Sequence, residues 1–168
     1  MGEQSANIIM KITVPKPAPA VAKLGYFVGS WIVEGTIPPG PWGSGGPFSW
    51  TDKTEWLSGN FFVVGHWDFK MPADLGGGGQ EIFILGYDVE KTVYTFDAFS
   101  SQGRHVRSTG TITDNVWVWE SEASYEADKV KQRYTTRILS PDRYEVKFEI
   151  CEDGKTWLAF MLGAAQRT

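Results

Sequence analysis

The sequence predicts an all-β fold, a closed antiparallel meander barrel of about ten strands with one short N-terminal helix. Three observations carry this prediction. Segments suited to strands follow one another after residue 30, separated by short turns. Aromatic residues make up 14% of the chain, with eight Trp, which is typical of an interior lined by rings. A meander this long leaves two exposed edges unless it closes on itself.

Composition limits the classes of protein to consider. The chain has 168 residues, enough for one domain with an ordinary core. The apolar fraction of 42%, without an apolar run long enough for a membrane helix, excludes a disordered chain and a helical membrane protein. A net charge of −4 predicts no nucleic-acid partner. With one cysteine, Cys151, and no targeting segment, we expect no internal disulfide, no membrane partner and a cytoplasmic location.

One segment before the barrel is predicted to be helical. Residues 1–18 read as an extended, proline-containing lead-in, and residues 19–168 as the single barrel domain. Val21, Leu24 and Val28 recur at helical spacing just before Gly29, which predicts a helix of about ten residues.

The strands are separated by recognisable turn chemistry. Ser58-Gly59 and residues 101–103, 140–142 and 152–154 are hairpin-type turns. Residues 38–47 and 76–79 are rich in Gly and are either plain connectors or mobile lips over a cavity. The predicted strands are 30–37, 48–57, 60–70, 80–87, 92–100, 104–112, 115–122, 129–139, 143–151 and 156–166.

Turn lengths predict which face points inward. A two-residue turn at 58–59 pairs Trp56 with Phe61, and the 152–155 loop pairs Ile150 with Trp157. The inward face is then almost wholly apolar, and it forms either a filled core or, as we favour, a partly empty cavity that holds a ligand. The candidate ligand-binding residues are Trp31, Trp50, Trp56, Phe61, Trp67, Gln132, Tyr134, Thr136, Tyr144, Phe148, Trp157 and Met161.

The last strand is apolar on both faces. The same pairing places Trp157, Ala159 and Met161 inside, and the alternate residues outside, where large apolar side chains need a cover. The cover is either the N-terminal segment or a second copy of the chain, and we expect the second copy. The predicted homodimer surface is Leu158, Phe160 and Leu162.

Three charged residues share one face of a predicted hairpin. With residues 101–103 as the loop, Phe99 pairs with His105 and Asp97 with Arg107. Asp97, His105 and Arg107 are then either a solvated surface cluster or, if they face the cavity, candidates for acid–base catalysis. Asp52 lies on the inner face near the end of its strand, where we expect a solvated rim residue.

No cofactor or metal site is predicted. The chain has two His and one Cys, and it has no CxxC, HExxH, Walker or GxGxxG pattern.

The order of several short motifs resembles a known family. They are Gly29-x-Trp31, a Trp-Leu-x-Gly-x-Phe hairpin at 56–61, Gly-Tyr-Asp at 86–88 and Asp-Gly at 153–154. Over residues 24–167 the chain is similar to a family of uncharacterised, lipocalin-like bacterial proteins. The resemblance implies a barrel related in shape to fatty-acid-binding proteins and to nitrobindin, a haem-binding barrel. Haem binding is not carried over, because no His follows His105 to serve as the axial ligand.

These features predict a protein that binds a small, flat, hydrophobic ligand in the barrel, as a carrier, a sequestering protein or a sensor. One alternative is an enzyme of isomerase, cyclase or dehydratase type, acting on a hydrophobic metabolite in the same cavity. An ionisable group that faces the ligand would favour this alternative. A second alternative is a protein–protein interaction module that uses the exposed apolar face.

Overall fold

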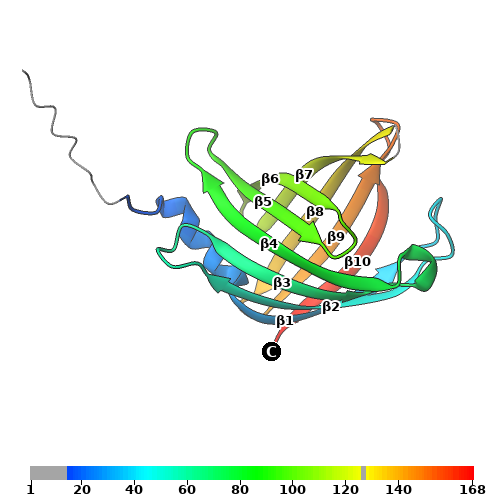
Figure 1. Ribbon diagram of the computed structural model, residues 1–168, viewed down its shortest axis with the longest axis horizontal. Coiled ribbons are helices and arrows are strands. Elements are labelled where there is room, and N and C mark those ends of the chain that lie inside the picture. Colours follow the sequence, from blue (N-terminus) through cyan, green and yellow to red (C-terminus); the bar gives the residue numbers. More distant parts are fainter. Residues whose placement is uncertain (1–14, 126–127) are drawn as a thin grey trace, which may run out of the picture.

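The computed structural model describes residues 15–125 and 128–168, and its ten strands close into a single antiparallel barrel (Figure 1). Every strand pairs with its neighbours in sequence, and the last pairs with the first. The predicted fold class is therefore confirmed. The strands are β1 (Gly29–Ile37), β2 (Gly46–Trp56), β3 (Val63–Lys70), β4 (Gly78–Asp88), β5 (Val93–Ser100), β6 (His105–Thr113), β7 (Val116–Tyr125), β8 (Asp128–Ser140), β9 (Arg143–Cys151) and β10 (Leu158–Arg167).

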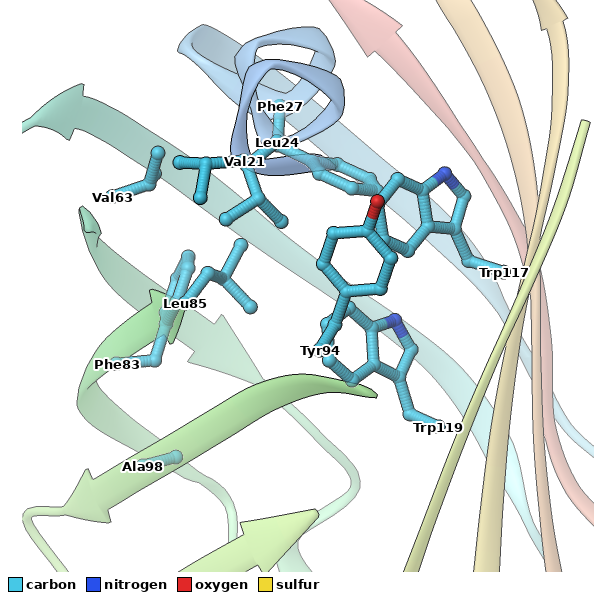
Figure 2. Close-up of a cluster of buried hydrophobic side chains, with 10 residues drawn as sticks. All are labelled: Val21, Leu24, Phe27, Val63, Phe83, Leu85, Tyr94, Ala98, Trp117 and Trp119. Atoms are coloured by element: carbon cyan, nitrogen blue, oxygen red, sulfur yellow. The ribbon is translucent and has the colours of Figure 1, made fainter. Parts of the chain in front are cut away.

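One end of the barrel is closed by a 3-10 helix, η1 (Pro19–Phe27) (Figure 1). Its buried residues are Val21, Leu24 and Phe27, a spacing of three that matches three residues per turn rather than the α-helical spacing that the sequence suggested. They pack against rings and aliphatic side chains of the barrel wall, including Tyr94 and Trp117 (Figure 2). The other helix is the three-residue η2 (Ala73–Leu75), and no helix in the described ranges could cross a membrane.

An arginine from the last strand fixes this closed end. The Arg167 guanidinium donates hydrogen bonds to the carbonyl oxygens of Val28 at 2.6 Å and Tyr26 at 2.8 Å. It also lies 4.1 Å from the Trp31 ring centroid, and the Trp31 indole donates to the Phe27 carbonyl at 3.0 Å. The end of η1 is thus bound to both strands that close the barrel.

The β2–β3 hairpin is longer than predicted. Trp56 pairs with Val63, not with Phe61, so residues 57–62 form the loop and Phe61 lies outside both strands. This shift of two residues preserves the predicted faces, because side chains alternate with a period of two. Trp50 and Trp67 therefore still point inward, as the sequence predicted.

The predicted faces of β10 were wrong for residues 157–160 and right for Met161 and Leu162. The register shifts between Ala159 and Met161, which turns Phe160 inward against Phe148, with ring centroids 5.8 Å apart. Before the bulge, Trp157 lies outside, with Arg133 4.1 Å from its ring centroid. Among the three residues proposed for a dimer surface, Leu158 and Leu162 remain exposed. Leu158 pairs with Ile150, which lines the cavity, whereas Leu162 pairs with Lys147 on the outer face. The homodimer stays a prediction that now rests on Leu162 alone among the three.

Candidate ligand-binding cavity

The barrel encloses a cavity of about 1090 Å³, at the upper end of the range for small-molecule sites. Phe27 of η1 bounds it at the closed end. At the opposite end the rim is made by loops and strand ends, which include Trp42, Leu75 and Arg104. The cavity is thus closed on one side by η1 and bordered on the other by the 38–47 loop and by η2; Gly78 and Gly79 of the predicted 76–79 connector belong to β4.

Half of the wall is a continuous belt of aromatic rings contributed by β2 to β7. Phe48 stacks on Trp50 at 5.3 Å between centroids, and Trp50 lies 5.5 Å from Trp67. Trp67 lies 4.7 Å from Phe83, whose ring stacks on Phe96 at 5.5 Å. Rings packed in this way present faces and edges that suit a flat conjugated molecule.

Glycines on the neighbouring strands leave room for these rings. A Cβ at Gly65 would overlap the Phe83 ring, and one at Gly110 would overlap the Trp119 ring. The two rings therefore lie flat over backbone on the next strand instead of standing upright in the lumen. This arrangement keeps the cavity open despite the number of large side chains.

The other half of the wall, from β8 to β10, is more polar. Gln132, Tyr134 and Thr136 follow one another at alternate positions of β8 and all line the cavity. The Ser121 hydroxyl donates to the Gln132 side-chain oxygen at 3.2 Å. A bound molecule would thus meet rings on one side and hydrogen-bonding groups on the other.

Asp52 is a buried carboxylate inside this cavity, not the solvated rim residue that was expected. It is 4% exposed, because its cross-strand partners are Trp31 on β1 and Trp67 on β3. The Thr54 hydroxyl donates a hydrogen bond to it at 2.5 Å. Burial raises the pKa of Asp52 to about 6, and the hydrogen bond from Thr54 and the nearby Trp67 indole oppose this rise.

Two buried indole groups in the same wall have unused hydrogen-bonding capacity. The Nε1–H groups of Trp50 and Trp67 form no hydrogen bond of good geometry in the described part of the chain, although that of Trp67 lies near enough to Asp52 to lower its pKa. An unpaired buried donor costs roughly 1–3 kcal/mol, so such groups are usually explained by a bound partner or a functional role.

Most of the residues predicted from sequence to bind ligand do line the cavity. They are Trp50, Trp67, Gln132, Tyr134, Thr136, Tyr144, Phe148 and Met161. Four do not: Trp31 lies under Arg167, Trp56 packs in the core beneath η1, Phe61 is in a loop and Trp157 is outside. Lining residues not predicted from the sequence include Phe48, Asp52, Phe69, Phe83, Phe96, Trp119 and Phe160. The regular alternation within β4, β5 and β7 could have identified the rings of those strands.

The charged cluster lies on the outer face of the barrel. The predicted pairing of Asp97 with Arg107 and of Phe99 with His105 is confirmed. Arg107 Nε donates to Asp97 at 2.7 Å, and His105 Nε2 lies 3.3 Å from the same oxygen. The His105 ring stacks on exposed Phe99 at 4.5 Å, and His105 reaches the cavity only at its rim, whereas Asp97 and Arg107 do not line the cavity. In the described residues, no group of three His, Cys, Asp or Glu side chains could hold a metal ion.

Comparison with known proteins gives a family and a fold. The family described as "Protein of unknown function (DUF1579)" matches residues 16–167. No curated protein matches the chain. Rv2717c from M. tuberculosis has a similar structure, with a TM-score of 0.61 and 15% identity over 91% of this chain and 99% of that one. The S-type phycobiliprotein lyase CPES from Guillardia theta has a TM-score of 0.58 and 12% identity, over 89% and 92%. At these identities the likeness concerns the fold alone.

Proposed function

This chain belongs to the DUF1579 family, a family of unknown function, and we propose that it binds a small, flat, hydrophobic molecule inside its barrel. The observation that carries the proposal is the cavity of about 1090 Å³, with an aromatic belt on one side and polar side chains on the other. A barrel packed solid would have no such space. Carrying, sequestering or sensing the molecule are the roles that such a site supports.

The structure favours ligand binding over catalysis by the three charged residues that the sequence suggested. The enzyme alternative depended on Asp97, His105 and Arg107 facing the ligand, and these side chains lie on the outer face. Asp52 is the most buried carboxyl group among the described residues that line the cavity. In the described residues, no second acid or base forms a hydrogen bond with it, so its surroundings suit recognition of a ligand better than proton transfer.

A titration with Nile red, a flat and neutral dye whose emission shifts to the blue in apolar surroundings, tests the proposal. We expect saturable binding at one site per chain, accompanied by quenching of the tryptophan fluorescence. An absence of saturable binding at high micromolar protein would contradict the proposal.

Two matched double variants locate the site. Ser108 and Ser121 face the cavity on adjacent strands, so Ser108→Trp with Ser121→Trp should fill the lumen and weaken Nile red binding. Thr109 and Glu120 are exposed and pair across the same two strands, so Thr109→Trp with Glu120→Trp adds the same rings outside. If both double variants weaken binding equally, the dye does not occupy the cavity.

A further inference from the structure

We propose that the ligand of this cavity carries a protonated nitrogen, and that this nitrogen forms an ion pair with the Asp52 carboxylate. The inference rests on the proposed function and gives the ligand a chemical class, a flat apolar amine. It is drawn from the partners of Asp52, from the charges that line the cavity and from the rings around the carboxylate.

The first observation is that Asp52 is buried without a cation. Its side chain accepts a hydrogen bond from Thr54, and no lysine, arginine or histidine of the described chain forms an ion pair with it. Buried carboxylates are normally paired, because transfer of an unpaired charge out of water is costly. The ligand is therefore the natural source of the missing positive charge.

Among the described residues, the other carboxylate with similar burial is paired twice. Glu149 is 5% exposed, and it lies 2.9 Å from Arg133 Nε and 2.7 Å from Lys147 Nζ. These pairs hold the pKa of Glu149 below its usual range despite its burial, whereas the pKa of Asp52 is raised. The absence of a cation at Asp52 is thus a property of that position and not of the protein in general.

The second observation is the charge that surrounds the cavity. Among the described residues that line it, acidic residues outnumber Lys and Arg residues, so a cation entering the lumen meets a favourable potential. The acidic residues are Asp52, Glu81, Glu122 and Glu152, the basic ones are Lys70 and Arg104, and His105 lies at the rim. Glu81 differs from Asp52 in having Arg104 near enough to oppose the rise in its pKa that burial causes.

The third observation is that four aromatic residues lie near Asp52. Trp31 and Trp67 lie beside it on β1 and β3, and Tyr134 and Tyr144 lie within electrostatic range on β8 and β9. Burial raises the pKa of both phenols, so neither carries charge between pH 5 and 8. A carboxylate within a group of aromatic rings is the arrangement that recognises ammonium groups, because the ring faces also attract cations.

Three naphthalene probes with the same ring and a cationic, a neutral or an anionic one-carbon substituent test the inference by isothermal titration calorimetry: 2-naphthylmethylamine, 2-naphthalenemethanol and 2-naphthoate. At pH 7.5 we expect the amine to bind at least about tenfold more tightly than the alcohol, and the carboxylate to bind most weakly. At pH 5, where Asp52 takes up a proton, the amine should lose most of this advantage.

Asp52→Asn is the decisive variant, because the amide has a similar shape and keeps an acceptor for Thr54. It should lower the affinity for the amine to that for the alcohol, and it should leave binding of the alcohol within about threefold. Asp68→Asn removes an exposed carboxylate from the outer face of the neighbouring strand, and it should change neither affinity. Thermal unfolding checks that both variants are folded.

An amine that binds no more tightly than the alcohol would overturn the inference, whether both bind or neither does. So would an advantage of the amine that survives Asp52→Asn. Nile red separates these outcomes from failure of the proposed function. If the dye binds in the cavity while the amine shows no advantage, the barrel binds ligands without recognising a cation.

Discussion

Replacing Asp52 with Asn should make the protein more stable at neutral pH. In the folded protein burial raises the pKa of Asp52 to about 6, against 3.8 for the free side chain. The difference of about two pKa units corresponds to roughly 3 kcal/mol, at about 1.4 kcal/mol per unit. This is the free energy of unfolding that the protein loses by holding an ionised carboxylate in the cavity wall.

The sign of the pH dependence follows from proton uptake. Between pH 4 and 6 the folded protein keeps a proton that the unfolded chain releases, so the free energy of unfolding falls as the pH rises through this window. The amide introduced by Asp52→Asn carries no charge at any pH. The difference between the variant and the wild type should therefore be near zero at pH 4, grow up to about pH 6 and level off at roughly 2–3 kcal/mol.

Urea unfolding, followed by tryptophan fluorescence at pH 4, 5, 6 and 7.5, measures this difference directly. The comparison cancels contributions from other groups, such as Asp97 and Glu149, whose pKa values are lowered. Asp68→Asn serves again as the control and should follow the wild type. The reasoning is refuted if the Asp52→Asn variant is less stable than the wild type at pH 7.5, or if the difference does not depend on pH. A gain in stability with a loss of amine binding is the trade-off expected of a functional residue.

Other predictions test the two ends of the barrel and its walls. Trp67→Ala should weaken Nile red binding, because Trp67 lines the cavity. Trp56→Ala should mainly destabilise the core beneath η1, by about 3 kcal/mol or more. Dye titration combined with urea unfolding separates the two effects. Arg167→Ala removes three hydrogen bonds to backbone carbonyls and should lower the free energy of unfolding by about 2–4 kcal/mol, with Arg167→Lys intermediate. An unchanged urea midpoint would show that these hydrogen bonds from Arg167 add no stability. Gly110→Ala should push the Trp119 indole into the lumen, which should lower the free energy of unfolding by about 1–3 kcal/mol and reduce the affinity for the dye. Unchanged dye affinity would show that the position of the Trp119 ring does not depend on the glycine. If a dimer forms through the outer face of β10, light scattering should give twice the chain mass, and Leu162→Glu should reduce the measured mass to that of one chain. A wild-type protein that is monomeric at high micromolar concentration would contradict this prediction.

Local patterns in the sequence determined the strands, the faces of most of them and one complete hairpin register. The alternation of Arg143 to Cys151 assigns inner and outer sides by itself, because a strand repeats every two residues. The pairing of Asp97 with Arg107 followed from the loop at residues 101–103. The place of the helix was predicted too, since apolar residues at its spacing end just before Gly29.

Tertiary structure decided what depends on contacts between distant parts of the chain. A register shift within β10 turned Phe160 inward. The alternating pattern of a sequence does not show where a strand contains an extra residue, so this shift could not be predicted. Position along the barrel axis separated Trp67, which lines the cavity, from Trp56, which packs under η1, although both face inward. The pKa of Asp52 depends on walls contributed by strands far away in sequence. Alternation identifies the face of a residue, but its depth, its solvation and its charge partners arise only when the sheet closes.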